Sequence, residues 1–328
     1  MSATGGDHVP YRARFDCLWC GDAWTTRGPD DLEGWAQLCP DCVGKAGDNG
    51  FLRFRLHQAI AERGAAARVG GDAASETTGG TAVGAATAGE TAGTAATQAV
   101  GASDIDAEMV AYYDARAPEY DDWYLRRGRY SHGPIHDAAW DAELDVAGRW
   151  LDALPIGGDI VELAAGTGWW SPLLAAKGEA SLYDANDAPL ARARDRLVAH
   201  GLRAHLHVRD AWAEPDRAVD ALFTGFWLSH VTDDRLPDFL ALVHRWLKPG
   251  GLFAFIDSMD DPSSGTVDRT AVVDGVSTRR LADGRAFRVV KVYRDPARFA
   301  SALEDAGFVD VEAGTTGRFF VHGAGRAG

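Results

Sequence analysis

The stretch DIVELAAGTGWW, residues 159–170, constrains the fold more strongly than any other part of the chain. Its apolar run predicts a buried strand, and Gly166 and Gly168 predict a tight loop directly after that strand. Because glycine has no Cβ atom, a ligand can approach the backbone of such a loop closely. We therefore expect this strand and loop to form one wall of a binding site.

Segments typical of strands and helices alternate around this stretch. Helices are expected over 107–128 with a break at Pro118, and over 138–154, 170–178, 188–201, 234–251 with its Pro-Gly-Gly stop, and 296–306. Strands are expected over 159–164, 180–185, 204–211, 219–226, 252–258, 308–314 and 318–323, with a hairpin over 277–293 that turns at Asp283-Gly284. This alternation predicts βαβ units and a parallel sheet covered on both faces, which is an α/β fold.

The composition divides the 328 residues into three regions. Residues 11–64 hold aromatic residues and all four cysteines, and residues 105–328 hold the α/β pattern. Residues 65–104 consist almost entirely of Gly, Ala, Thr and Ser, and this composition has too little apolar bulk to offset the loss of chain entropy. We interpret them as a flexible linker. An alanine-rich helix is the alternative, which the repeated Gly and Thr disfavour.

The formal net charge of −15 argues against nucleic acid as a partner, because an acidic surface repels phosphate backbones. The first residues lack the apolar region of a signal peptide. No stretch approaches the roughly 20 apolar residues that span a bilayer. We therefore expect a cytoplasmic protein without a membrane segment.

Cys17, Cys20, Cys39 and Cys42 form two Cys-x-x-Cys pairs. Four thiolates at this spacing predict a closed tetrahedral zinc site, which is structural because no position stays open for catalysis. A redox dithiol is the alternative, but no thioredoxin-like βαβ pattern surrounds the pairs. A helix over 51–64 is expected to pack on this zinc module. The module has few lysines, which favours a protein-docking or dimer contact over an RNA contact.

The glycine loop narrows the class of ligand. A nucleoside triphosphate site would close in Gly-Lys-Ser/Thr, and a dinucleotide site would carry a third glycine where Trp169, Trp170 and Ser171 stand here. A nucleoside without phosphates fits better. Asp184 and Asp210, at the ends of the next two strands, are placed to accept hydrogen bonds from ribose hydroxyls and from an exocyclic amine. Each could instead serve only a turn or a helix cap.

Five ordered elements, VELAAGTG, YDAND, RDAW, FTGFWLSH and LKPGG, resemble the class I S-adenosylmethionine-dependent methyltransferases of the small-molecule, quinone-biosynthesis type. The resemblance covers about residues 105–325 and departs at Ala164, where many members have a third glycine. It implies a Rossmann-like sheet, parallel with an antiparallel last strand, and S-adenosylmethionine as the cofactor. It assigns cofactor contacts to Glu162, Ala164, Ala165, Gly166, Thr167, Gly168, Asp184, Ala185, Asp210, Ala211, Trp212 and Phe226. Glu162 could instead cap a neighbouring helix.

Residues 112–133, the lid segment, resemble the helix that covers the cofactor in this family. The candidates that it offers for the substrate pocket are Tyr112, Tyr120, Trp123, Tyr124, Tyr130 and His132. Aromatic residues at helical spacing also often belong to the core. As pocket residues they predict an aromatic and only lightly charged site, which suits a planar or apolar acceptor better than a phosphate.

Methyl transfer from a sulfonium depends on positioning and desolvation, and it needs a base only where the nucleophile must lose a proton. His230, just past the strand at 219–226, is the candidate base, and Ser229 is a weaker polar candidate. His230 could instead pack under the lid segment or cap the following helix.

These patterns predict an S-adenosylmethionine-dependent methyltransferase that acts on a small-molecule acceptor by in-line methyl transfer. Two alternatives are open at this stage. One is an RNA or protein methyltransferase recruited through the zinc module. The other is a non-catalytic protein that keeps the cofactor fold as a scaffold.

Overall fold

A computed structural model describes residues 14–16, 23–25 and 102–328 of the chain, which divides into two compact units, residues 1–99 and 100–328. In the first unit, strand β1 (Arg14–Asp16) pairs antiparallel with strand β2 (Ala23–Thr25). The four cysteines, the helix expected over 51–64 and most of the expected linker lie outside the described residues. The zinc site therefore stays a prediction.

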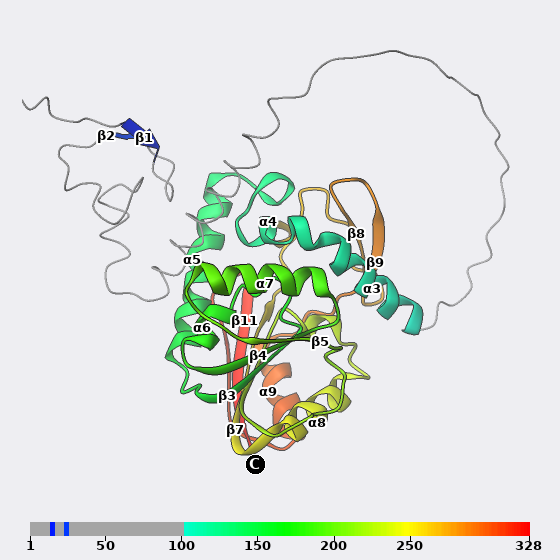
Figure 1. Ribbon diagram of the computed structural model, residues 1–328. Coiled ribbons are helices and arrows are strands. Elements are labelled where there is room, and N and C mark those ends of the chain that lie inside the picture. The colour runs from blue at the N-terminus through cyan, green and yellow to red at the C-terminus, as the bar shows by residue number, and fades with distance from the viewer. Residues whose placement is uncertain (1–13, 17–22, 26–101) are drawn as a thin grey trace, which may run out of the picture. The chain divides into compact units, whose positions relative to one another are not determined.

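A seven-stranded sheet in the order β10-β11-β7-β6-β3-β4-β5 forms the centre of the second unit (Figure 1). Its strands are β3 (Gly158–Leu163), β4 (Gly178–Asp184), β5 (His205–Val208), β6 (Val219–Gly225), β7 (Leu247–Ser258), β10 (Phe308–Thr315) and β11 (Phe320–Ala327). β3 to β7 pair in parallel, and β11 runs antiparallel to both β7 and β10. The α/β sheet with an antiparallel last strand is thus confirmed.

Helices cover both faces of this sheet. They are α5 (Pro134–Ala153), α6 (Ser171–Ala175), α7 (Asp187–Ala199), α8 (Leu236–Trp246) and α9 (Pro296–Asp305). Leu182 of β4 packs in one cluster with Leu190 and Leu197 of α7, whereas the next residue, Tyr183, contacts Trp246 of α8. Successive strand residues point to opposite faces, so a strand covered on both sides is apolar throughout.

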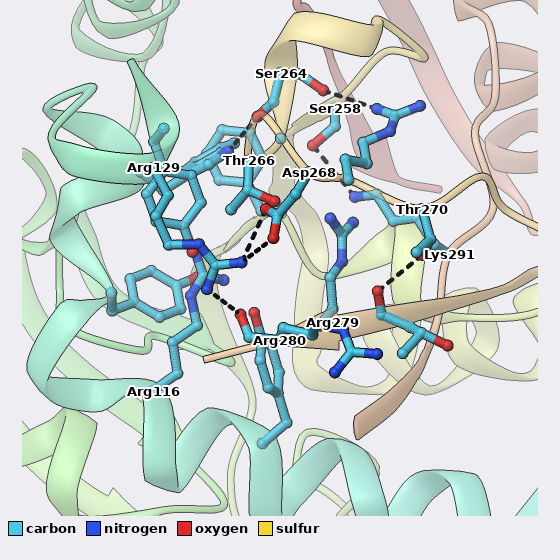
Figure 2. A pocket seen from close by; sticks show the side chains of 18 of the residues that line it. Arg116, Arg129, Ser258, Ser264, Thr266, Asp268, Thr270, Arg279, Arg280 and Lys291 are labelled. Carbon is cyan, nitrogen blue, oxygen red and sulfur yellow. Dashed lines mark hydrogen bonds and ion pairs between the residues drawn. The ribbon is translucent and has the colours of Figure 1, made fainter. Parts of the chain in front are cut away.

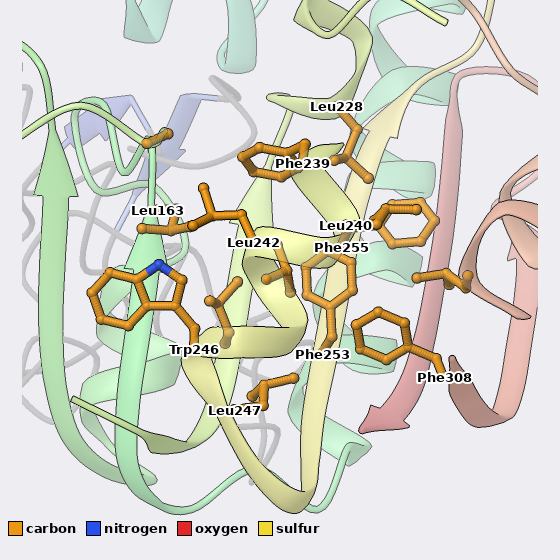
Figure 3. Close-up of a cluster of buried hydrophobic side chains, with 14 of the residues drawn as sticks. Leu163, Leu228, Phe239, Leu240, Leu242, Trp246, Leu247, Phe253, Phe255 and Phe308 are labelled. Atoms are coloured by element: carbon orange, nitrogen blue, oxygen red, sulfur yellow. The ribbon is translucent and has the colours of Figure 1, made fainter. Parts of the chain in front are cut away.

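The larger hydrophobic cluster joins α8 and α9 to the sheet (Figure 3). Phe253 and Phe255 of β7 lie 5.7 and 4.5 Å from Phe308 and Phe299, measured between ring centroids. β7 begins at Leu247, earlier than expected. Its pairing with β6 changes register across the Lys-Pro-Gly-Gly segment, so the predicted helix stop is also the first part of the strand.

The segment before the sheet forms α3 (Ala102–Arg116), a 3-10 turn (Ala117–Glu119), α4 (Asp121–Tyr124) and a second 3-10 turn (Gly128–Tyr130). α3 starts inside the stretch assigned to the linker, which extended to residue 104. Pro118 follows the end of α3, as predicted from its missing N–H. Within the described residues, no helix combines the length and apolar composition that a membrane crossing requires.

The expected hairpin is also present, as β8 (Val276–Arg280) and β9 (Ala286–Val290). Gly284 in its turn has a φ of +90°, a value that glycine adopts readily. The hairpin packs on α3 through a buried cluster that includes Met109, Tyr112, Leu281 and Val289. α3, α4 and the β8–β9 hairpin lie together at one end of the sheet (Figure 1).

Candidate active site

A first cavity, with about 770 Å³ of empty space, lies where the parallel strands end. The loops after β3, β4, β5 and β6 form its floor, and α3 forms the opposite wall with Asp106, Met109, Val110 and Tyr113. The chain order of the sheet reverses between β3 and β6. Loops diverge from such a switch point in opposite directions, which leaves a crevice that ligands occupy in α/β sheets.

The loop after β3 is held in a conformation that keeps its backbone accessible. Ala164, Gly166 and Gly168 have φ values of +51°, +56° and +70°. A Cβ atom on Gly168 would lie 2.7 Å from the Cβ of Ala193, so the missing side chain lets the loop rest on α7. A Cβ atom on Gly166 would lie 3.7 Å from the ring of Tyr120, so this glycine widens the gap between loop and lid segment.

Asp184, the last residue of β4, fixes this loop. Its carboxylate accepts hydrogen bonds from the backbone N–H groups of Gly166 at 2.8 Å and Asn186 at 2.9 Å. Burial raises the pKa of Asp184 to about 6, although the two hydrogen bonds favour the ionised form. Asp210 is exposed and accepts a hydrogen bond from the backbone N–H of Trp212 at 2.7 Å. With Asp106 on α3, three carboxylates therefore line one largely apolar cavity.

A family model described as a methyltransferase domain matches residues 160–251. The ubiquinone/menaquinone biosynthesis C-methyltransferase UbiE of Coxiella burnetii is 31% identical over 179 residues, which cover 48% of this chain and 70% of that enzyme. The chain belongs to the class I S-adenosylmethionine-dependent methyltransferases. The dimethylglycine N-methyltransferase of Parasynechococcus marenigrum is 36% identical over 129 residues, which cover 38% of this chain and 44% of that enzyme.

Solved structures agree with this assignment. The DhpI–SAH complex shares 31% sequence identity with this methyltransferase at a TM-score of 0.55, covering 70% of this chain and 99% of that chain. The DhpI–SAM–HEP complex gives the same identity and TM-score, and it covers 69% of this chain and 100% of that chain.

The first cavity of this methyltransferase fits its cofactor. It joins apolar strand-end residues, which suit an adenine ring, to the carboxylates of Asp184 and Asp210, which suit hydroxyl and amine donors. The gap over Gly166 leaves room beside the backbone. Eight of the residues predicted to bind the cofactor line it, namely Ala164, Gly166, Asp184, Ala185, Asp210, Ala211, Trp212 and Phe226.

The other four predicted residues, Glu162, Ala165, Thr167 and Gly168, do not line the first cavity. Glu162 is 2% exposed beneath the loop and accepts a hydrogen bond of 2.5 Å from the hydroxyl of Ser171, the first residue of α6. Burial raises the pKa of Glu162 to about 8. This hydrogen bond is not a helix cap, because it comes from a side-chain hydroxyl and no side chain caps α6.

The lid segment is tied to the glycine loop by a set of contacts that the sequence did not reveal. Asp121 of α4 accepts hydrogen bonds from the Thr167 hydroxyl and from the guanidinium of Arg196, both at 2.6 Å. Arg196 of α7 also donates to the carbonyl of Thr167. One half-buried arginine thus joins the lid segment, α7 and the loop.

A second cavity, with about 790 Å³ of empty space, adjoins the first. Tyr113, Tyr120, Phe226 and His230 line both cavities, so these four residues form a shared wall. Four of the predicted substrate residues line the second cavity, namely Tyr112, Tyr120, Trp123 and Tyr130.

Tyr124 and His132 are the two predicted substrate residues that line neither cavity. Tyr124 is buried and stacks on Trp169 with ring centroids 4.1 Å apart, and His132 forms a 3.1 Å hydrogen bond with the carbonyl of Gly265. Trp169 and Trp170, which stand where a dinucleotide site would carry a third glycine, are both buried in the core.

The prediction of a lightly charged substrate pocket does not hold for the second cavity. Six cationic residues line the second cavity, and Figure 2 labels all of them except Arg269: Arg116, Arg129, Arg269, Arg279, Arg280 and Lys291. Three of the six come from the segment after β7 and from the hairpin, and a fourth, Lys291, follows the hairpin directly. The sequence-based expectation used only the lid segment, and these residues lie far from it along the chain.

His230 lies at the shared wall and is 8% exposed. Its Nδ1 is 2.6 Å from the carbonyl of Val290, and its Nε2 is 2.7 Å from the hydroxyl of Tyr113. Because a carbonyl only accepts, Nδ1 carries the proton and Nε2 accepts from Tyr113. Burial, and then the charge of Lys291, lower the pKa of His230 well below its ordinary value, so the ring is neutral at pH 7. Tyr113 was missed because it resembles any core tyrosine of an amphipathic helix.

The affinity for S-adenosylhomocysteine is expected to fall as the pH drops through about 6. Asp184 is ionised above its pKa and can accept hydrogen bonds from ribose, and it becomes protonated below that pH. Calorimetric titrations at about pH 5 and about pH 7.5 would measure the change. Asp184→Ala should weaken binding by about 1–3 kcal/mol at the higher pH and flatten the pH dependence.

Asp210→Ala is the matched control, because it removes the exposed carboxylate of the same cavity. It should keep the fall in affinity below about pH 6. An unchanged pH dependence in Asp184→Ala would show that another group is responsible.

Proposed function

We propose that this methyltransferase transfers a methyl group, in line, to a small-molecule acceptor bound in the second cavity. The observation that carries the proposal is the shared wall, because an acceptor in the second cavity lies directly beside the first cavity. The lid segment, the hairpin and residues 258–270 surround that space, which suits a small molecule better than a polymer. Two relatives are themselves named for small molecules, ubiquinone/menaquinone and dimethylglycine.

The residues of the first cavity would hold the cofactor in three places. The backbone around Gly166 would hold the methionine portion, Asp184 the ribose, and Asp210 with Ala211 the adenine. S-adenosylmethionine supplies a methyl group on a sulfonium sulfur, and because the departing thioether is neutral, no acid is required. The protein therefore contributes mainly position and a dry surrounding.

Some methyl acceptors must lose a proton during the transfer. The Tyr113–His230 pair would take up that proton. Nε2 of His230 already accepts from the Tyr113 hydroxyl, so a proton given up in the second cavity can reach His230 through Tyr113. The low pKa of His230 makes it a weak base. A weak base is sufficient for an oxygen nucleophile, because the oxonium that methylation would form is strongly acidic.

The acceptor class is tested by supplying S-adenosylmethionine with a labelled methyl group to the full-length chain. Low-molecular-mass metabolites, total RNA and total protein from a bacterial extract serve as three separate acceptor pools. We expect label in the metabolite pool alone. Label in RNA or protein would replace the small-molecule proposal by the recruited-methyltransferase alternative, and absence of cofactor binding would favour the scaffold alternative.

With an acceptor from the metabolite pool that loses a proton on methylation, His230→Gln and Tyr113→Phe are expected to lower turnover. General base catalysis contributes about 10²–10⁴-fold, so losses in that range are expected for His230→Gln. Affinity for S-adenosylhomocysteine should change less than about threefold, because neither side chain provides a charge to the first cavity. Turnover within about twofold of wild type would make both residues structural.

We further propose that Cys17, Cys20, Cys39 and Cys42 bind one structural zinc ion, as their type and spacing predict. Metal analysis of chain purified without chelators should then find one zinc per chain. Cys20→Ser and Cys42→Ser should each lose it, while S-adenosylhomocysteine affinity stays unchanged. Four titratable thiols in a zinc-free, folded preparation would contradict the site.

A further inference from the structure

We infer that the acceptor carries an anionic oxygen group, either a carboxylate or a phosphoryl group, that binds a cationic cradle of Arg116, Arg279 and Lys291. The inference rests on the proposed function, because it names the chemical class of the small molecule in the second cavity. It stands on different residues, since none of the three lines the first cavity.

The charge of the second cavity is opposite to that of the whole chain. Six cationic residues and a single carboxylate, Asp268, line it, which gives 6 − 1 = +5. Asp257 and Asp260 pair with Lys291 and Arg269 from behind the wall. With these two carboxylates included, the net charge is still 5 − 2 = +3. The chain as a whole carries −15. A cationic hollow in an acidic protein attracts small anions and repels cations.

Two of the six cations are held in close pairs with carboxylates, at less than 3 Å. Arg129 donates to both oxygens of Asp268, at 2.8 and 2.6 Å. Arg269 donates to Asp260 and to the carbonyl of Asp261, both at 2.7 Å. These pairs hold the wall of the second cavity in shape. The remaining charge is therefore concentrated on the cradle and on the exposed Arg280.

Arg116 is the clearest member of the cradle. It is 8% exposed, and among the described residues no carboxylate pairs with it. Its guanidinium lies over the ring of Tyr120 at 4.5 Å and over those of Tyr112 and Tyr130 at 5.6 Å, and its Nε has no hydrogen-bond partner in the described part of the chain. Burying an unpaired cation costs several kcal/mol, of which ring contacts return only about 1–2. An anionic ligand would provide the missing partner.

Lys291 is 6% exposed, and its only ion pair within the described residues, with Asp257, is a long one. Its Nζ donates to the hydroxyls of Ser229 at 2.7 Å and Ser258 at 3.3 Å, whereas the Oδ1 of Asp257 is 4.0 Å away. Asp257 instead accepts from the backbone N–H groups of the same two serines. An ammonium has three donors, so one remains for a ligand.

Arg279 completes the cradle from β8. Its side chain lines the second cavity together with that of Tyr293, and within the described residues no ion pair involves it. After burial, the charges that lower the pKa of Lys291 to about 8 include those of Arg279 and Arg116. All three cations line the second cavity, so their like charges repel one another there. An oxyanion shared between them would relieve that repulsion, and guanidinium groups match carboxylate and phosphoryl oxygens in geometry.

Inorganic phosphate and acetate are suitable probes for the two oxyanion types. Each is titrated calorimetrically into the full-length chain saturated with S-adenosylhomocysteine. We expect one of the two anions to bind at one site per chain. Tighter binding of phosphate would indicate a phosphoryl acceptor, and tighter binding of acetate would indicate a carboxylate acceptor. Lys291→Met and Arg279→Gln should each weaken this binding at least about tenfold, the equivalent of one charge-assisted hydrogen bond.

Arg285→Gln is the matched control, because Arg285 is exposed on the hairpin turn, pairs with Asp283 and does not line the cavity. It should leave anion binding unchanged, and Arg279→Lys should restore part of it. The inference would be overturned if neither anion binds, or if Lys291→Met and Arg279→Gln bind the anion as tightly as the wild-type chain does. Failure of S-adenosylhomocysteine to bind would instead defeat the proposed function, and the anion titrations without it would still test the cradle.

Discussion

The carboxylate of Asp184 is the contact on which the rest of the site depends. It holds the N–H groups of Gly166 and Asn186 together, so it fixes the loops after β3 and β4 as one surface. That surface is the floor of the first cavity, and it sets the gap to Tyr120 in the lid segment. Burial of the carboxylate disfavours its ionised form, and ribose hydroxyls would favour that form again. Loop conformation and, on our proposal, cofactor binding thus depend on one side chain.

The two cavities have opposite electrostatic character although they share a wall. Carboxylates face the first cavity, which suits a cofactor with a sulfonium cation, whereas arginine and lysine face the second. On our account each ligand is attracted to its own side, and the aromatic residues of the shared wall separate them from water. The tie between Asp121, Arg196 and Thr167 keeps the lid segment over both. Such an arrangement positions two ligands before any chemistry occurs.

The fold could be predicted from local patterns, because the spacing of apolar residues indicates where each strand and helix lies. The strand ends with Asp184 and Asp210 could be placed for the same reason. The charge of the second cavity could not, since Arg279 and Lys291 reach it only when the β8–β9 hairpin packs on α3. The Tyr113–His230 pair likewise joins residues 117 positions apart. Glu162 was assigned to the cofactor by resemblance, and only its burial shows that it supports the loop.

The most direct test of this account is a crystal structure of the full-length chain with S-adenosylhomocysteine. The account predicts the ribose at Asp184, the adenine beside Asp210 and Ala211, and the sulfur facing the shared wall of Tyr113, Phe226 and His230. The second cavity should then remain continuous with the sulfur through that wall. A ligand bound elsewhere, or a sulfur directed away from the second cavity, would contradict the central claim that the two cavities form one active site.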